Sequence, residues 1–445
     1  MKVIIYGAGY VGCVTGACFA RMGHLVVIID VIQSKVESLR AGRSPILEPD
    51  LEDLIAEGVA NGRLKAEMAV ASGDAGLLEA DVAVVCTGTP AQRNGLVDTR
   101  ALRRVFQSIA SGAARRVSPL TVIVRSTALA PMLREILAEA QPCQGANKLR
   151  LVVNPEFLRE TTAISDFFNP PLLVVGGDDP TAVAHALSLF KGIQAPRHKV
   201  SLETASMLKY TCNAFHALKI AFANEIDTLA AMIGADGRDV MNLMVQDTIL
   251  NISPAYLRPG FAFGGSCLPK DLRALEALAR ENHQPLPLLS SVLPSNRQRM
   301  EQALETILSR PARRLGFIGL SFKMGSDDLR DSPYVELVER LLGKGFEIAI
   351  YDSDLDPKRL VGANMAHVME RLPHLARILV NSPEEACVHA EAVVVCKRLL
   401  NLEALRALVP DGVVIYDLNR MVTSARPTGS PDGDIEPEHE KAFHG

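Results

Sequence analysis

The chain has 445 residues, with 47 lysines and arginines against 51 aspartates and glutamates and a net charge of −4. This near balance, without a basic run, argues against a protein that binds nucleic acid through bulk charge. Hydrophobic residues make up 48% of the chain, which is ample for large cores. No apolar stretch reaches the roughly 18–20 residues that a membrane span needs. We therefore expect neither nucleic-acid nor membrane partners.

The eight cysteines are scattered, with no C-x-x-C pair and no spacing typical of a zinc site. We expect most thiols to be free, and we expect no metal. The N-terminal segment MKVIIYGAGY lacks the charged region, long apolar core and cleavage site of a signal peptide. Together these features predict a cytoplasmic protein in a reducing setting.

Short apolar runs alternate with helical stretches through the first part of the chain. The runs are rich in Val and Ile and do not alternate with polar residues, which is typical of strands buried on both faces of a parallel sheet. This pattern predicts a doubly wound α/β domain over residues 1–200. The predicted strands are Lys2–Tyr6, Leu25–Asp30, Asp81–Cys86, Thr121–Arg125, Leu149–Val153 and Pro171–Val175.

A long helix is predicted from Ser201, which can cap its start, because no Pro or Gly interrupts the chain before Gly234. Some 33 residues at 1.5 Å each would make a rod of about 50 Å. A rod of this length usually joins domains or carries an oligomer interface, so we assign residues 201–295 to a central helical region. Further helices are predicted at Arg238–Gln246, Asp271–Glu281 and Asn296–Ser309.

The alternation of strand and helix returns around Arg314 and predicts a second, smaller α/β domain over residues 296–425. Its predicted helix is Pro333–Gly343, and residues 426–445 are expected to form a flexible tail. Its predicted strands are Leu315–Leu320, Glu347–Tyr351, Ala392–Cys396 and Val413–Tyr416.

The turn Gly7-Ala8-Gly9-Tyr10-Val11-Gly12 follows the first strand and opens a helix. Its glycines allow a tight turn, close approach of a pyrophosphate and close helix–strand packing. Asp30 ends the second strand, where a carboxylate accepts from ribose hydroxyls and would repel a 2′-phosphate, so NAD is favoured over NADP. The alternative is a glycine turn in a domain that binds no nucleotide. Lys35 could reach the same ribose or be an ordinary exposed lysine.

Two threonines follow strands at the edge of the sheet where ligands bind. Thr89 lies in Cys86-Thr-Gly-Thr89-Pro90, and Thr127 in Arg125-Ser-Thr127. Both are candidates to contact the cofactor or a catalytic water. The alternative is that both are turn hydroxyls.

The segment Phe261-Ala-Phe-Gly-Gly265-Ser-Cys267-Leu-Pro-Lys270-Asp271 is the best candidate for the chemical site. Cys267 lies just before a predicted helix, and a helix N-terminus with a nearby lysine lowers the pKa of a thiol and makes it nucleophilic. The residue types alone leave open whether Cys267 is catalytic.

Lys209 and Asn213 lie four residues apart on the long helix, so both project from one face toward a ligand or toward solvent. His216 lies one turn further on, and we expect it to be a histidine of the hydrophobic core rather than a catalytic residue. Glu156 and Glu160 follow another strand, and their carboxylates could activate water or belong to a capped surface turn.

Together these elements resemble the UDP-glucose/GDP-mannose dehydrogenase family, and its GDP-mannose 6-dehydrogenase branch in particular. The resemblance runs from residue 1 to about residue 420. The motifs that carry it are Gly7–Gly12, Ser44–Pro49, Thr87–Pro90, Asn154–Glu160, Lys209–Ile226, Pro259–Asp271 and Gly319–Pro333.

The family resemblance implies an N-terminal NAD-binding Rossmann domain, a helical dimerisation region and a C-terminal nucleotide-sugar domain, in a homodimer or higher oligomer. It implies oxidation of a sugar C6 alcohol to a carboxylate by two NAD, through a cysteine thiohemiacetal and thioester. GDP-mannose is the expected substrate and UDP-glucose the alternative. An uronate polysaccharide such as alginate is the pathway that the family suggests.

Residue roles follow by matching motifs. The resemblance implies catalytic roles for Cys267, Lys209, Asn213, Asp271, Glu156 and Thr127. It implies cofactor contacts for Gly7, Gly9, Tyr10, Val11, Gly12, Asp30, Lys35, Thr89, Thr127, Glu160, Lys270 and Arg330. It implies substrate contacts for Glu156, Phe157, Leu158, Lys209, Asn213, His216, Tyr256, Arg258, Phe261, Gly264, Cys267 and Lys323.

Two readings outside this class stay open. A hydroxyacid dehydrogenase of the 6-phosphogluconate type also joins a Rossmann domain to a long helix, but it stops at two electrons and needs no cysteine. A protein that only senses NAD would need no catalytic residue at all. One departure from the family pattern follows Thr127, where Ala128-Leu-Ala-Pro131 replaces Val-x-Pro-Gly.

Overall fold

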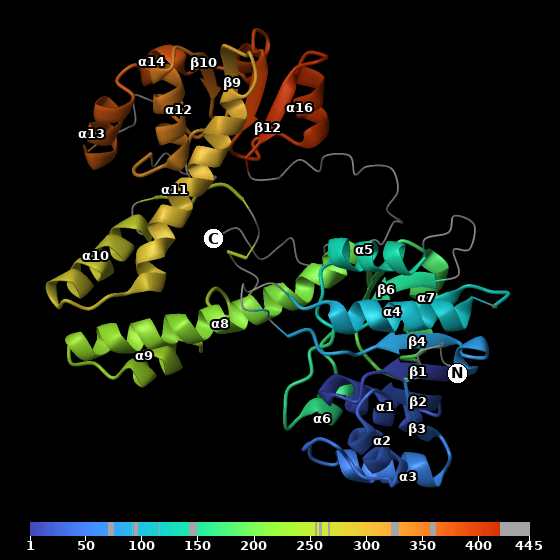
Figure 1. The fold of residues 1–445 in the computed structure, drawn as a ribbon. Coiled ribbons are helices and arrows are strands. Elements are labelled where there is room, and N and C mark those ends of the chain that lie inside the picture. Colours follow the sequence, from blue (N-terminus) through green and yellow to red (C-terminus); the bar gives the residue numbers. More distant parts are fainter. Residues whose placement is uncertain are drawn as a thin grey trace. The chain divides into compact units, whose positions relative to one another are not determined.

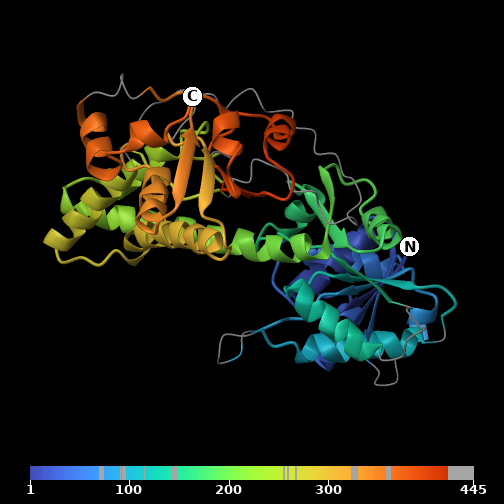
Figure 2. The same cartoon turned by 90° about the horizontal axis from the view of Figure 1, so that it is seen from above.

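The computed structural model describes residues 1–69, 75–90, 92, 97–114, 116–141, 149–253, 256–257, 260–265, 268–321, 329–356 and 362–418. These residues divide into two compact units, which lie within Met1–His216 and Ala217–Thr428 (Figures 1 and 2). In the described part of the chain, every helix is too short or too polar to cross a lipid bilayer.

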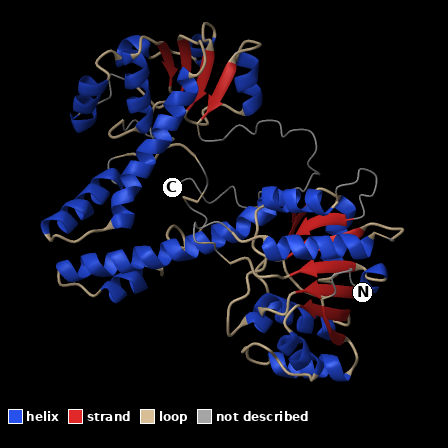
Figure 3. Cartoon of the chain, in the orientation of Figure 1, coloured by secondary structure: helices blue, strands red, loops and turns tan. Residues whose placement is uncertain are grey.

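The first unit contains an eight-stranded sheet with the order β3-β2-β1-β4-β5-β6-β7-β8. Figure 3 draws the strands in red. The strands are β1 (Lys2–Tyr6), β2 (Leu25–Asp30), β3 (Leu64–Met68), β4 (Val82–Val85), β5 (Leu120–Val124), β6 (Leu149–Val153), β7 (Leu173–Gly177) and β8 (Arg197–Val200). The helices are α1 (Tyr10–Arg21), α2 (Gln33–Arg40), α3 (Leu51–Ala60), the 3-10 helix η1 (Ala75–Leu78), α4 (Arg100–Ala113), α5 (Ala130–Ala140), α6 (Ala163–Phe168) and α7 (Pro180–Ser188).

Both faces of this sheet are buried. Val3 and Ile5 of β1 belong to one hydrophobic core, which they share with α1, α2, α3, α6 and α7. Ile4 and Tyr6 of the same strand belong to a second core, shared with α4, α5 and the start of α8. The doubly wound arrangement predicted from the apolar strands is therefore confirmed.

The predicted strands of this unit are all present, but two further strands escaped prediction. These are β3 and β8, the two edge strands, which carry polar residues such as Lys65, Glu67 and Lys199. An edge strand can leave one face in water, so it lacks the continuous apolar run of a central strand. One pair departs from the parallel pattern, because β7 runs antiparallel to β6.

The long helix α8 (Leu202–Met232) contributes residues to both units. Ser201 caps it as predicted, because its hydroxyl oxygen accepts the N–H of Thr204 at 3.1 Å. Glu225 of α8 accepts the N–H groups of Leu288 and Leu289 at 2.7 and 2.9 Å, which anchors the first turn of α11 (Pro287–Leu308).

The second unit contains a four-stranded parallel sheet with the order β10-β9-β11-β12. Its strands are β9 (Arg314–Ile318), β10 (Glu347–Tyr351), β11 (Ala392–Val395) and β12 (Val414–Asp417). Its other helices are α9 (Gly237–Met244), α10 (Leu268–Glu281), α12 (Pro333–Gly343), α13 (Gly362–Arg371), α14 (Leu375–Ile378), α15 (Pro383–Cys387) and α16 (Leu402–Leu408).

A buried ion cluster lies at the carboxyl end of this second sheet. Lys397, which is 4% exposed, lies 2.8 Å from a carboxylate oxygen of Asp352 and of Asp354. Asp352 also accepts the N–H groups of Leu320, Ser321 and Asp354 at 2.8–3.0 Å. Both oxygens of Asp352 therefore carry two donors each, and the cluster joins the turn after β9 to the ends of β10 and β11.

Candidate active site

The glycine turn between β1 and α1 has the geometry of a phosphate-binding loop. Gly7 has a φ of +109°, and a Cβ there would lie 2.8 Å from the carbonyl oxygen of Cys86. A Cβ on Gly12 would overlap the carbonyl oxygen of Gly7, whereas nothing lies within 4 Å of where a Cβ on Gly9 would stand. Tyr10 and Val11 begin α1 directly behind this open space. The turn thus fits the pyrophosphate of a dinucleotide.

Asp30 lies at the end of β2 beside this turn. One carboxylate oxygen accepts the N–H of Ala8 at 2.6 Å, and the other accepts the N–H of Ile32 at 2.8 Å. Because a carboxylate offers about four acceptor sites, Asp30 keeps capacity for ribose hydroxyls. Lys35 is half-buried in the first turn of α2. The residues present therefore fit NAD.

The two predicted threonines come together at the carboxyl edge of the first sheet. The Thr89 hydroxyl donates to the carbonyl oxygen of Thr127 at 3.0 Å, and the Tyr210 hydroxyl of α8 donates to the same oxygen at 3.5 Å. The Thr89 contact joins two segments that are 38 residues apart in the sequence, and a role for Thr89 at the cofactor stays a prediction. Thr127 lies next to the long helix.

Lys209 and Glu156 form a buried ion pair. Lys209 Nζ lies 2.9 Å from Glu156 Oε1, and the two side chains are only 16% and 10% exposed. The lysine ammonium also lies 5.8 Å from the ring centroid of Phe157. Lys209 is therefore not part of a solvated stripe, and Glu156 is not part of an exposed turn.

This ion pair lines a cavity of about 600 Å³ in the first unit. Its wall also includes Phe157, Leu158, Asn213 and His216. His216 is exposed on α8, so the expectation of a core histidine is wrong. The structure thus brings six of the predicted substrate residues together. Glu160 is exposed and does not line this cavity, although its charge acts on Tyr10.

Glu48 is a buried carboxylate to which no role was assigned from the sequence, although it lies in the Ser44–Pro49 motif. It accepts the Tyr10 hydroxyl at 2.5 Å and the N–H groups of Thr161 and Ala163 at 2.8 Å each. Burial and the hydrogen bond to Glu48 raise the pKa of Tyr10. Glu48 therefore joins the helix behind the nucleotide turn to the loop after Glu160.

The remaining described residues of the predicted site lie in the second unit. Phe261 stacks on Tyr334 with ring centroids 5.3 Å apart. Lys270 and Asp271 form an exposed ion pair of 3.1 Å at the start of α10. Tyr256 is exposed and has a φ of +60°.

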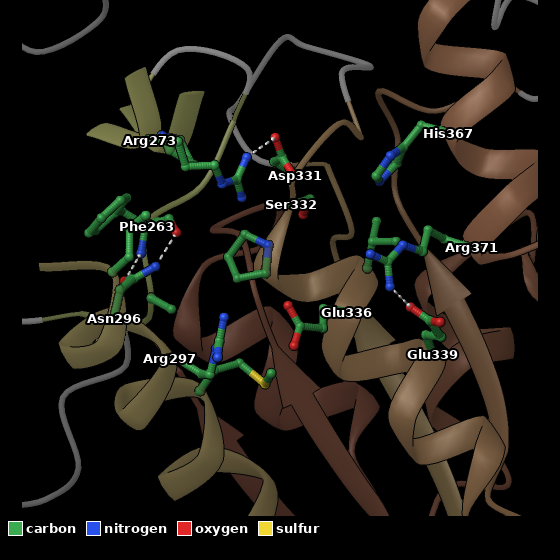
Figure 4. Close-up of a pocket in the computed structure, with 16 residues that line it drawn as sticks. Phe263, Arg273, Asn296, Arg297, Asp331, Ser332, Glu336, Glu339, His367 and Arg371 are labelled. Carbon is green, nitrogen blue, oxygen red and sulfur yellow. Dashed lines mark hydrogen bonds and ion pairs between the residues drawn. The ribbon is translucent and has the colours of Figure 1, made fainter. Parts of the chain in front are cut away.

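Gly264 packs against the segment that follows Arg330. A Cβ on Gly264 would overlap the carbonyl oxygen of Asp331, which also accepts the N–H of Gly265 at 3.2 Å. A small cavity of about 150 Å³ lies beside this contact. Arg273 pairs there with Asp331 at 3.6 Å (Figure 4). Arg330 is half-buried and does not line this cavity.

Three predicted site residues, Cys267, Arg258 and Lys323, lie outside the described residues. Their roles stay predictions. No group of three His, Cys, Asp or Glu side chains that could hold a metal ion occurs in the part of the chain that the structure describes.

Three models of the UDP-glucose/GDP-mannose dehydrogenase family match the chain in order. The NAD binding domain matches residues 1–194, the central domain 203–298 and the UDP binding domain 316–424. The chain is 39% identical to a GDP-mannose 6-dehydrogenase of Pseudomonas putida over 94% of this chain and 96% of the relative. It is 33% identical to a UDP-glucose 6-dehydrogenase of Bacillus subtilis over 79% of both chains.

Solved structures agree with this assignment. A ternary complex of GDP-mannose dehydrogenase from Pseudomonas aeruginosa matches with a TM-score of 0.90 and 38% identity, over 96% of this chain and 99% of that one. A UDP-glucose dehydrogenase from Pyrobaculum islandicum matches with a TM-score of 0.54 and 30% identity, over 94% of both chains. The chain belongs to the UDP-glucose/GDP-mannose dehydrogenase family and is an NAD-dependent nucleotide-sugar dehydrogenase.

Proposed function

We propose that the protein oxidises the C6 alcohol of GDP-mannose to the carboxylate of GDP-mannuronate. Relatives that are 38–39% identical over most of their length and are named GDP-mannose 6-dehydrogenase support this substrate. Each turnover consumes one alcohol, one water and two NAD, and yields one carboxylate, two NADH and three protons. UDP-glucose is the second candidate, because the third family model is described as a UDP binding domain.

The observation that carries this proposal is the Lys209–Glu156 ion pair in the cavity of the first unit. A buried ammonium stabilises the negative charge that develops when the C6 hydroxyl gives up its proton. The Asn213 amide can donate to the same oxygen, and the Glu156 carboxylate can accept a proton from water. The pair thus supplies the acid–base and oxyanion functions that alcohol oxidation needs.

Cys267 is proposed as the nucleophile of the second oxidation. Its thiolate adds to the aldehyde and forms a thiohemiacetal, and removal of a hydride leaves a thioester. Water, steered by Glu156 or Thr127, then attacks the thioester carbon and releases the acid and the thiol. Asp271 is proposed to handle the water and protons. When bound, NAD accepts the hydride at each oxidation.

The backbone of Gly7–Gly12 and the Asp30 carboxylate are proposed to hold NAD, with Lys35, Thr89 and Thr127 nearby. The open space at Gly9 and the spare acceptor sites of Asp30 support this role. Roles for Glu160, Lys270 and Arg330 at the cofactor, and for Arg258 and Lys323 at the substrate, rest on the resemblance of their motifs.

We also propose that the central helical region forms a homodimer. Large apolar side chains on its helices are exposed, including Ile220 on α8 at 64% and Leu243 on α9 at 68%. Several exposed apolar side chains on neighbouring helices are typical of an interface. Light scattering of the purified protein tests this, and we expect a dimer that Leu243→Glu weakens.

The function is tested with purified protein, NAD and a panel of GDP- and UDP-sugars, by following NADH. We expect GDP-mannose to react fastest and to yield two NADH per sugar. A yield of one would contradict the four-electron reaction and favour a hydroxyacid-type dehydrogenase. If UDP-glucose reacts clearly faster, the substrate assignment is wrong. If Cys267→Ser leaves turnover intact, the thioester mechanism is wrong.

A further inference from the structure

Arg125 is a buried cation at the carboxyl end of β5, where it lines the cavity of the first unit. The residue is 7% exposed. Its Nη1 donates to Asn154 Oδ1, and its guanidinium lies 6.0 Å from the ring centroid of Phe190. Its Nε has no hydrogen-bond partner among the described residues, and none of their carboxylates forms an ion pair with it.

A buried charge is costly unless an opposite charge compensates for it. Glu156 is the carboxylate whose charge acts on Arg125, but Glu156 already pairs with Lys209 at 2.9 Å. The charge of one carboxylate therefore acts on two cations.

The other charges of the cavity wall cancel. Besides Arg125, Lys209 and Glu156, the wall contains Arg159 and Asp166. Arg159 donates two hydrogen bonds to the Asp166 carboxylate, at 2.7 and 3.1 Å. Among the charged side chains that the structure describes there, the wall keeps an excess of one positive charge, and Arg125 supplies it.

We propose that Arg125 makes this cavity selective for the anionic species of the reaction. The inference rests on the proposed function, in which a neutral C6 alcohol becomes an oxyanion and finally a carboxylate. A fixed positive charge in a water-poor site interacts more strongly with an anion than with an alcohol. An arginine suits this role because its guanidinium keeps its charge when buried.

Arg125 could instead serve only to hold Asn154, whose amide donates to the carbonyl oxygen of Val174 at 2.8 Å. The two roles differ in what they predict. A residue that only shapes the loop before Glu156 affects binding of the alcohol and of the carboxylate alike. A residue that supplies charge affects binding of the carboxylate much more.

The test compares binding of GDP-mannuronate and of GDP-mannose by calorimetry in the absence of NAD, where no turnover occurs. In Arg125→Gln we expect the affinity for GDP-mannuronate to fall on the order of tenfold more than the affinity for GDP-mannose. Arg125→Lys keeps the charge and should keep the selectivity within about twofold. The matched control is Arg100→Gln, because this side chain is 83% exposed and does not line the cavity, so both affinities should change alike.

Equal losses for the two ligands in Arg125→Gln would overturn the proposal. If that variant does not fold, Arg125→Lys decides, because loss of selectivity with the charge retained would also overturn it. A wild-type protein that binds neither GDP ligand would contradict the proposed function itself, so the two failures are distinguishable.

Discussion

Glu48→Gln tests whether one buried carboxylate holds the nucleotide turn and the loop after Glu160 together. Glu48 Oε2 accepts the Tyr10 hydroxyl and the N–H of Thr161, and Oε1 accepts the N–H of Ala163. Glutamine replaces one acceptor oxygen with an NH₂ donor. Whichever way its amide is turned, one of the two backbone N–H groups then faces a donor instead of an acceptor.

The size of the effect follows from the burial of this site. Glu48 is 7% exposed, and Ala163 is fully buried. A buried N–H without a partner costs about 1–3 kcal/mol, and a hydrogen bond to a charged group contributes about 1.5–3 kcal/mol. We therefore expect Glu48→Gln to lower the free energy of unfolding by about 2–3 kcal/mol, and Tyr10→Phe by about 1.5 kcal/mol, the lower end of this range, because it removes one donor only and leaves both backbone N–H groups paired.

Urea unfolding followed by circular dichroism measures the loss, and calorimetry with NAD measures its functional consequence. We expect both variants to bind NAD severalfold more weakly, since Tyr10 begins the helix behind the turn. Glu79→Gln is the matched control, because this carboxylate is exposed and pairs with Lys2 on the surface. The reasoning is refuted if Glu48→Gln is no more destabilising than this control, or if Tyr10→Phe costs more than Glu48→Gln.

Three further variants test other parts of the molecule. Gly9→Ala and its control Gly343→Ala should each change the free energy of unfolding by less than about 0.5 kcal/mol, because both sites have open space. Of the two variants, Gly9→Ala alone should weaken NAD binding. Normal NAD binding by Gly9→Ala would contradict the assignment of this turn as a phosphate-binding loop. Lys209→Met should lower kcat by about 10²–10³ with a smaller change in KM for the sugar; an unchanged kcat in NADH assays would refute its role. Lys397→Met should lower the free energy of unfolding in urea by about 3–5 kcal/mol, whereas Lys2→Met, at an exposed ion pair, should lower it by less than about 1 kcal/mol. Equal losses would show that the buried cluster contributes little to stability.

Much of the fold could be predicted because central strands carry continuous apolar runs. The edge strands β3 and β8 could not, since their exposed faces hold residues such as Lys65 and Lys199. The sequence predicts a helix from Asn296, but α11 begins at Pro287 and continues through Pro294. A proline inside a helix usually marks a boundary, and here tertiary anchoring by Glu225 outweighs it.

The candidate site was predictable where a motif lies on one element. Lys209 and Asn213 share a helix face, which their spacing of four residues on a predicted helix already indicates. The Lys209–Glu156 pair joins residues that are far apart in the sequence, so it needs the folded sheet. Arg125 carried one signal, a charge that ends an apolar strand at the ligand edge. The sequence around such an arginine does not show whether its side chain is exposed or buried, so the burial of Arg125 is known only from the structure.

The saturated carboxylate of Asp352 has a consequence for how one chain can handle two nucleotides. Both sheets place a glycine turn after a strand and an aspartate at the end of the neighbouring strand, as Gly7 with Asp30 and Gly319 with Asp352 show. Asp30 accepts two backbone N–H groups and keeps free acceptor sites on its carboxylate. Asp352 accepts three backbone N–H groups and the Lys397 ammonium, so its acceptor sites are all occupied. The two glycine turns therefore differ, because, of these two aspartates, only the one beside the first turn keeps acceptor sites to which ribose hydroxyls would donate.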